Sequence, residues 1–294
     1  MGWAQGFIAV DWGTTNRRAY RVDSARQCTA EFEDGQGILA VAPGGFPAAV
    51  AEIRERLGDH PLLMAGMVGS NRGWVEAPYA PCPAGLGDLV HGLAWAEDGR
   101  AAIVPGVSYQ AVGRADVMRG EEVQILGAAA AGAIPPDCLV CHPGTHNKWI
   151  RLVGGRIAEF RTVMTGEMFN LLKANSILSD LLTDEVTAGP AFLQGVRRGL
   201  SDIVLSAELF SVRAGVLLGD IAREDAGDLT SGLLIGADLR VGLEGSSGDI
   251  IVMGRPELTK LYKAALGEAG RGAREFDGEQ AFLAGIAAIV ELIA

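Results

Sequence analysis

The chain of 294 residues is longer than an average domain, so it predicts two domains or one duplicated domain. Its 25 basic and 36 acidic residues give a formal net charge of −11, which argues against nucleic acid or an anionic membrane as the main partner. Four unevenly spaced cysteines do not make a disulfide framework, and no segment reaches the roughly 18 apolar residues of a membrane span. We expect a soluble, cytoplasmic protein with reduced thiols.

The N-terminal part predicts a three-stranded meander. An apolar strand over 7–10 leads into the turn VDWGTTNR, residues 10–17, and further strands are expected over 18–22 and 27–33. A helix is expected over 45–57. Asp11 ends the first strand, where an unpaired carboxylate is costly, so we expect Asp11 to hold a magnesium ion directly or through water.

The segment 64–84 is interrupted by glycine and proline and cannot be one helix. It concentrates side chains that suit a small polar ligand, namely Ser70, Asn71, Arg72, Trp74, Glu76 and Tyr79. Because a guanidinium can hold a carboxylate through two hydrogen bonds, we expect Arg72 to bind a carboxylate of the ligand. A solvated loop over a packed aromatic side chain is the alternative.

Acidic residues precede and begin a helix predicted over 121–131. Asp116, Glu121 and Glu122 are therefore candidates for a general base. Acids in the first turn also favour the helix dipole, so a purely structural role is the alternative.

The stretch CHPGTHNK, residues 141–148, repeats the first turn 131 positions later. The matched pairs are Gly13 with Gly144, Thr14 with Thr145, Asn16 with Asn147, and Arg17 with Lys148. Strands are again expected over 139–141, 149–153 and 156–163, and Gly154-Gly155 predicts a two-residue hairpin. The acid is not repeated, since His142 stands opposite Asp11.

Cys138 and Cys141 form a CxxC beside His142 and His146, which raises a zinc site or a redox dithiol. On a strand, side chains three positions apart point to opposite faces. The two thiols are therefore poorly placed for either role, and we expect both to be buried in the core.

The later elements predicted are helices over 166–182, 191–200, 203–217, 257–268 and 279–293, and a strand over 250–253. Meanders and strand-helix pairs that occur twice predict an α/β protein of two similar lobes with a ligand cleft between them. The expected domains are 1–133 and 134–294, with the last helix able to pack back toward the first lobe.

The two Gly-Thr turns are the candidate phosphate-binding elements, because P-loop and Rossmann glycine motifs are absent from the sequence. Such a turn can present backbone N–H groups to phosphate oxygens. The expected cofactor-binding residues are Asp11, Gly13, Thr14, Thr15, Asn16, Gly144, Thr145, Asn147 and Lys148. Gly236 and Gly254 are expected at the adenosine end, although helix packing explains small residues there equally well.

The paired turns resemble the phosphate-1 and phosphate-2 elements of the sugar kinase, actin and heat-shock protein ATPase superfamily. More specifically, the chain resembles the 2-dehydro-3-deoxygalactonokinase family over most of its length. The segments that carry this resemblance are FIAVDWGTTNRRAY, MAGMVGSNRGWVEAPYAPCPA, DVMRGEEVQILGA, PGTHNKWIRL, TVMTGEMF and LLIGADLR.

The resemblance implies two ribonuclease H-like lobes of the actin-like ATPase fold, with ATP and Mg²⁺ as cofactors. It implies transfer of the γ-phosphoryl group to the 6-hydroxyl of 2-dehydro-3-deoxy-D-galactonate. Glycerol kinase-like relatives open a helix with Gly-Asp-Gln, which makes Glu121 the first candidate for the base, before Glu122 and Asp116. A kinase of another sugar or sugar acid, or an actin-like or chaperone-like ATPase, remains an alternative, and a homodimer is left open.

Overall fold

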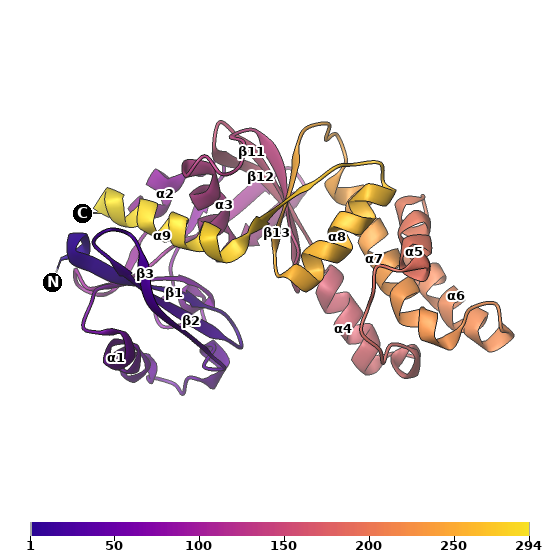
Figure 1. Ribbon diagram of the computed structural model, residues 1–294, viewed down its shortest axis with the longest axis horizontal. Coiled ribbons are helices and arrows are strands. Elements are labelled where there is room, and N and C mark those ends of the chain that lie inside the picture. The colour runs from indigo at the N-terminus through magenta and orange to yellow at the C-terminus, as the bar shows by residue number, and fades with distance from the viewer. Residues whose placement is uncertain (1, 294) are drawn as a thin grey trace. The chain divides into compact units, whose positions relative to one another are not determined.

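The computed structural model describes residues 2–293, which form two compact units (Figure 1). Unit 1 comprises Met1–Pro136, Leu152–Glu159 and Gly278–Ala294, and unit 2 comprises Asp137–Arg151 and Phe160–Asp277. The chain therefore enters unit 2 after Pro136 and returns to unit 1 for its last helix.

Unit 1 is built on a six-stranded sheet of order β3-β2-β1-β4-β7-β6. Its strands are β1 (Gly6–Trp12), β2 (Arg17–Asp23), β3 (Cys28–Asp34), β4 (Leu62–Gly66), β6 (Ala94–Glu97) and β7 (Ala101–Ile103). β1 runs parallel to β4, with Asp11 opposite Ala65. Since the carboxyl ends of parallel strands share one edge, Asp11 lies beside the start of the loop that follows β4.

Apolar faces of helices cover this sheet. The amphipathic helix α1 (Phe46–Leu57) contributes four buried residues to a core with β1 and β4, Phe46, Val50, Ile53 and Leu57. Helices α2 (Leu86–His91), α3 (Glu121–Ala130) and α9 (Gly278–Ile293) pack together (Figure 1). A small sheet of β5 (Tyr79–Pro81), β8 (Gly106–Ala111) and β9 (Arg114–Met118) lies between β4 and α3 in the sequence.

Unit 2 contains a five-stranded sheet of order β12-β11-β10-β13-β14. Its strands are β10 (Cys138–His142), β11 (Asn147–Val153), β12 (Arg156–Val163), β13 (Ile250–Gly254) and β14 (Arg274–Asp277). The order matches β3-β2-β1-β4-β7 of unit 1, which confirms the predicted duplication. Gly154 and Gly155 have φ values of 58° and 74°, as their predicted two-residue hairpin requires.

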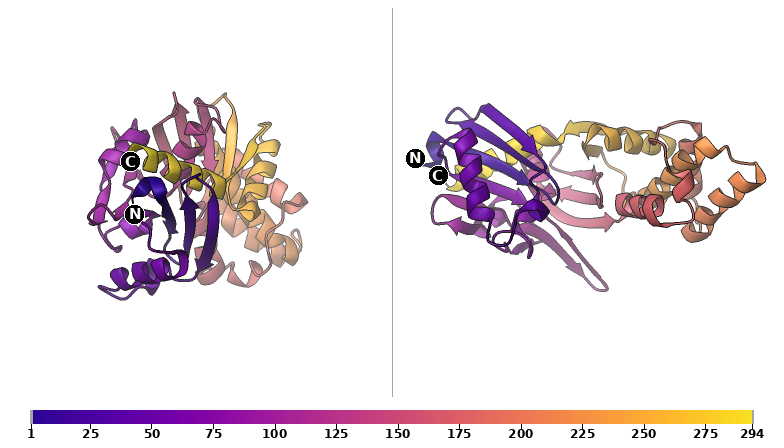
Figure 2. Two further views of the ribbon diagram at one scale, coloured as in Figure 1. Left: turned by 60° about the vertical axis from the view of Figure 1, so that its left-hand side comes forward. Right: turned by 90° about the horizontal axis from the view of Figure 1, so that it is seen from below.

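The helices of unit 2 are α4 (Thr165–Asn175), α5 (Pro190–Leu200), α6 (Leu205–Leu218), α7 (Ala226–Gly242) and α8 (Pro256–Glu268). Helix α7 packs closely on α5 and also contacts α6, and Figure 2 shows the three helices side by side. Short 3₁₀ helices cover Trp3–Gln5, Ile38–Ala40, Met67–Gly69, Ser179–Leu181 and Arg223–Asp225. No helix within residues 2–293 is long and apolar enough to cross a membrane.

The predicted helix over 166–182 is wrong beyond residue 175. Ser176 adopts an extended conformation, and its Oγ donates to the Leu172 carbonyl while accepting the N–H of Leu178. These side-chain bonds replace helical backbone bonds, so α4 ends at Asn175. Helix α7 was not predicted.

Candidate active site

The first Gly-Thr turn lies between β1 and β2, and backbone hydrogen bonds from residues 37–39 hold it in place. The carbonyls of Gly13, Thr14 and Thr15 accept the N–H groups of Ile38, Leu39 and Gly37, respectively. The N–H groups of Thr14 and Thr15 have no acceptor within the described chain. The turn therefore holds its carbonyls inward and leaves these amides available to an anion.

Asn16 and Arg17, two of the repeated positions, make contacts within unit 1. The side chain of Asn16 donates to Glu33 Oε1 at 3.2 Å, on the exposed edge of the sheet. Arg17 is fully buried and donates to both carboxylate oxygens of Asp34, at 3.2 and 2.7 Å. The cation of the first turn is therefore a structural residue.

Three segments of unit 1 converge at two glycines. A Cβ atom at Gly66 would lie 3.5 Å from Asp11 Oδ1, and one at Gly120 would lie 3.4 Å from Gly66 Cα. Both glycines have positive φ, at 94° and 115°. The end of β1, the loop after β4 and the N-terminus of α3 thus meet at one place.

The two acids at the N-terminus of α3 have different environments. Glu121 is partly exposed, and its Oε2 accepts the N–H of Arg119 at 3.2 Å. Glu122 is fully buried, and both its oxygens accept the N–H of Gly120, at 2.8 and 2.7 Å. Burial, and then the charge of Glu121, raises the pKa of Glu122 to about 8. Glu122 therefore carries its proton at neutral pH, which makes it a poor proton acceptor.

Asp116, the third candidate base, lies on β9 opposite Tyr109. Its Oδ1 accepts the N–H of Val117 at 2.9 Å.

The predicted ligand loop begins at this junction. Ser70 Oγ donates to the Met67 carbonyl at 2.7 Å, and Trp74 stacks on Phe46 with ring centroids 6.5 Å apart, so both hold the loop in place. The side chains of Asn71, Arg72 and Glu76 are exposed. Those of Asn71 and Arg72 make no hydrogen bond or ion pair within the described chain, which leaves them available to a ligand.

Arg119 links this loop to α3 and was not anticipated from the sequence. Its Nη2 donates to the Ala77 carbonyl at 2.8 Å, and its Cζ lies 4.3 Å from the centre of the Tyr79 ring. Its backbone N–H meanwhile holds Glu121. The ring of Tyr79 therefore helps to hold the loop in place through its contact with Arg119.

The second Gly-Thr turn lies between β10 and β11 in unit 2 and contacts the N-terminus of α4. The Thr145 carbonyl accepts the N–H of Glu167 at 2.8 Å, and a Cβ atom at Gly166 would lie 2.5 Å from the Gly144 carbonyl oxygen. His146 Nε2 lies 2.5 Å from Glu167 Oε2. A helix N-terminus beside a glycine turn is a favourable environment for phosphate.

Lys148 and Asn147 follow this turn on β11 and point to opposite faces of the sheet, as neighbours on a strand do. Asn147 is buried, and its side chain donates to Asp238. Lys148 is 5 % exposed, and its ammonium makes no hydrogen bond or ion pair with any residue from 2 to 293. Unlike Arg17, Lys148 is therefore a buried cation without a partner among these residues.

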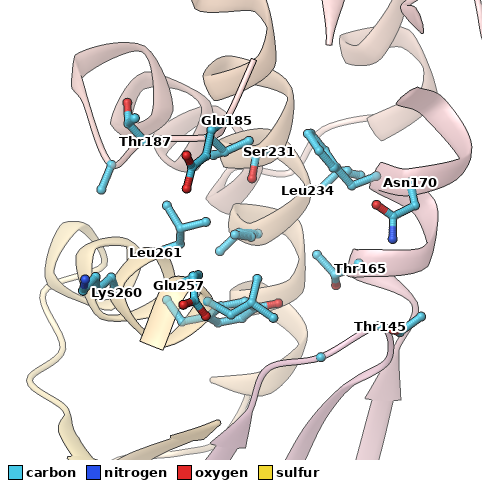
Figure 3. Close-up of a pocket in the computed structure, with 18 residues that line it drawn as sticks. Thr145, Thr165, Asn170, Glu185, Thr187, Ser231, Leu234, Glu257, Lys260 and Leu261 are labelled. Carbon is cyan, nitrogen blue, oxygen red and sulfur yellow. The ribbon is translucent and has the colours of Figure 1, made fainter. Parts of the chain in front are cut away.

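A pocket of ≈ 520 Å³ opens beside the second turn (Figure 3). Thr145 and Thr165 lie on one side of it, Ser231 and Leu234 come from α7, and Lys260 and Leu261 come from α8. Further lining residues are Gly144, Gly166, Phe169, Asn170, Glu185, Val186, Thr187, Ala188, Ile235, Glu257, Leu258 and Tyr262. Apolar walls with phosphate-binding groups at one end suit a nucleotide.

Gly236 and Gly254 do not line this pocket. A Cβ atom at Gly236 would lie 2.4 Å from the Val196 carbonyl oxygen, so this glycine allows α5 and α7 to pack closely. Gly254 ends β13 with φ of 155°, and a Cβ atom there would lie 3.2 Å from the Pro143 carbonyl oxygen, next to the second turn. The walls of the pocket were not predicted as a site, because they combine α4, α7, α8 and the segment 185–188, which lie far apart in the sequence.

The residues fit a magnesium ion that is held mainly by a bound ligand. Within residues 2–293, no group of three or more His, Cys, Asp or Glu side chains could hold a metal, and the CxxC thiols are buried on β10. Asp11 supplies a single carboxylate beside the first turn. One carboxylate together with phosphate oxygens and water is a common magnesium environment.

The duplicated sheet, with a Gly-Thr turn after the first strand of each copy, defines a protein of the sugar kinase and actin-like ATPase class. The same fold occurs in the solved structure of the (R)-2-hydroxyglutaryl-CoA dehydratase component A of Acidaminococcus fermentans, with a TM-score of 0.52 and 14% identity over 98% of both chains. This likeness shows the fold alone.

The particular family follows from closer relatives. The family model described as 2-keto-3-deoxy-galactonokinase matches residues 11–289. The 2-dehydro-3-deoxygalactonokinase of Escherichia coli (strain K12) is 36% identical over 293 residues, 98% of each chain. A crystal structure from Sinorhizobium meliloti, provisionally described as the same kinase, has a TM-score of 0.92 and 36% identity over 98% of this chain and 99% of that one. The chain belongs to the 2-keto-3-deoxy-galactonokinase family, which confirms the resemblance seen in the sequence.

Proposed function

We propose that the protein transfers the γ-phosphoryl group of ATP, with Mg²⁺, to the 6-hydroxyl of 2-dehydro-3-deoxy-D-galactonate. The chain belongs to a family of kinases, and the main structural support for the proposal is the junction of β1, the loop after β4 and α3 in unit 1. There the carboxylate of Asp11, the loop with Arg72 and the N-terminus of α3 with Glu121 meet at Gly66 and Gly120. A phosphate-side acid, a ligand loop and a candidate base in one place are the parts that phosphoryl transfer to an alcohol requires.

Each part has a defined task in this reaction. The amides of the two Gly-Thr turns and the ammonium of Lys148 bind phosphate oxygens, and the pocket of unit 2 takes the adenosine group. Glu121 accepts the proton of the attacking hydroxyl, because its carboxylate is fixed by the Arg119 amide and is not fully buried. A magnesium ion at Asp11 would neutralise charge on the phosphates.

The substrate carboxylate is assigned to Arg72, whose exposed guanidinium has no partner in the described chain. Replacing it in Arg72→Ala should raise KM for the sugar acid about tenfold or more and leave KM for ATP unchanged, since one charged hydrogen-bonding pair is worth about 1.5–3 kcal/mol. An unchanged KM for the sugar acid would remove this assignment.

The direct test is an ATP-coupled assay on 2-dehydro-3-deoxy-D-galactonate, with the product examined by phosphorus and carbon NMR. We expect one product, the 6-phosphate. Phosphorylation of another hydroxyl, or ATP turnover without sugar phosphate, would contradict the proposal.

The base is tested in the same assay. Glu121→Gln should lower kcat by about 10²–10⁴-fold, the usual contribution of a general base, and Asp116→Asn should stay near the wild-type rate. A near wild-type kcat in Glu121→Gln together with a large loss in Asp116→Asn would assign the base to Asp116 instead.

A further inference from the structure

One carboxylate on α7, that of Asp238, joins side chains from three other elements of unit 2. Asp238 is 1 % exposed. From β11, Asn147 Nδ2 donates to its two oxygens at 3.1 and 2.9 Å, and Trp149 Nε1 donates to Oδ1 at 2.7 Å. From α4, Thr165 Oγ1 donates to Oδ2 at 2.6 Å, and from α8 the Tyr262 hydroxyl donates to Oδ2 at 2.5 Å. We call Asp238 and these four donors the Asp238 cluster.

Burying the carboxylate of Asp238 costs free energy, because the group loses its hydration. No lysine or arginine of the described chain forms an ion pair with Asp238, so its charge is met only by neutral donors. Burial raises the pKa of Asp238, and the four hydrogen bonds act in the opposite direction. Since apolar residues of similar volume often stabilise a core as well as buried charges do, orientation of the donors is a better explanation than stability.

Two of the four donors line the pocket and two do not. Thr165 and Tyr262 contribute to its walls, whereas Asn147 and Trp149 lie outside it. Thr165 also precedes Gly166, which packs against the Gly144 carbonyl of the second turn. Helix α7, which carries Asp238, supplies Ser231 and Leu234 to the same pocket. Asp238 therefore connects the walls formed by α4, α7 and α8.

We propose that Asp238 is a positioning residue for the nucleotide, acting through Thr165 and Tyr262 to set the geometry of the pocket and of the neighbouring second turn. This inference rests on the proposed function, because it takes the pocket as the adenosine site. The hydroxyl of Tyr262 faces Asp238, so its effect on a nucleotide passes through the carboxylate.

The test is calorimetric binding of a non-hydrolysable ATP analogue with Mg²⁺ to the full chain and its variants. Asp238→Asn places an NH₂ group against N–H and O–H donors, and we expect the Kd of the analogue to rise about tenfold or more. Tyr262→Phe removes one donor, keeps the ring, and should also raise the Kd. In the double variant the combined fold-change in Kd should be smaller than the product of the two single fold-changes, because both substitutions act through one carboxylate.

Trp149→Phe is the matched control, because it removes a donor to Asp238 that does not line the pocket. It should lower the melting temperature as Tyr262→Phe does, yet leave the Kd within about twofold. If Tyr262→Phe and Trp149→Phe change the Kd equally, Asp238 is only structural, and this comparison stands even if Asp238→Asn does not fold. If the wild-type chain itself fails to bind the analogue, the proposed function fails instead.

Discussion

Arg17 and Lys148 occupy matching positions after the two turns, but the fold uses them differently. Arg17 places its guanidinium between Asp34 and the rings of Trp12 and Phe32, so its charge is satisfied within unit 1. Lys148 is nearly as buried and has no partner in the described chain. The repeat in the sequence could predict two cations, but it could not distinguish them, because the repeat does not include Asp34, which pairs with Arg17 from the neighbouring strand β3.

This difference predicts opposite consequences of substitution. Arg17→Leu should lower the free energy of unfolding by about 2–4 kcal/mol, because it removes two charged hydrogen bonds to Asp34 and leaves only the more exposed Arg56 as a cation beside that carboxylate. Lys148→Met keeps the buried volume and should change that free energy by less than about 1.5 kcal/mol, while kcat/KM for ATP falls at least about tenfold. Denaturant unfolding and steady-state kinetics on both variants measure this, and a Lys148→Met enzyme of normal kcat/KM would show that the ammonium does not reach phosphate.

Glu122 predicts a pH dependence of stability. Its pKa is raised from 4.5 to about 8 in the folded protein, so between these values the folded state binds a proton that the unfolded state has lost. Stability from this group therefore falls as pH rises from about 4.5 to about 8 and is constant above that range. Glu122→Gln lacks the ionisation, so its unfolding free energy relative to wild type should rise between about pH 4.5 and about pH 8. A difference that does not change with pH would contradict a buried, protonated Glu122.

At the scale of elements, close helix packing positions the pocket-lining helix α7. Glycines four residues apart on α5 and α7 face the partner's backbone, and a Cβ atom at Gly232 would lie 2.1 Å from the Phe192 carbonyl oxygen. Helix α7 was missed from the sequence because buried residues surround it on nearly all sides, which removes the one-sided pattern of an amphipathic helix. The strands and helices with one buried face, such as β1 and α1, could be predicted.

The packing predicts different effects of alanine at two glycines of α7. Gly232→Ala should lower the free energy of unfolding by about 3 kcal/mol or more, since rigid backbone blocks the new methyl group. In Gly227→Ala the new methyl group has no atom within 4 Å. This substitution should be neutral or stabilising by up to about 1 kcal/mol, because alanine favours the helix. Thermal and denaturant unfolding compare the two variants, and equal losses would mean that α5 and α7 do not pack as described.

At the scale of the whole molecule, the duplication was visible in eight residues and extends to five strands of each sheet. The turns, Asp11 and the α3 acids could be located from the sequence because they lie next to predicted elements. The walls of the pocket could not, because they combine α4, α7, α8 and the segment 185–188, which are brought together only by folding. A net charge of −11 also means that anionic ligands must be bound by a few well-placed cations.

The central claim is that the protein is a kinase selective for a 2-keto-3-deoxy sugar acid. The most direct measurement compares kcat/KM with ATP for 2-dehydro-3-deoxy-D-galactonate, its gluconate-derived C4 epimer and D-galactose. We expect the galactonate-derived acid to give the highest value, with at least about a hundredfold preference over the neutral hexose, because a site built for a carboxylate is left with an unpaired cation by a neutral ligand. Equal values for the acid and the neutral hexose would contradict the account.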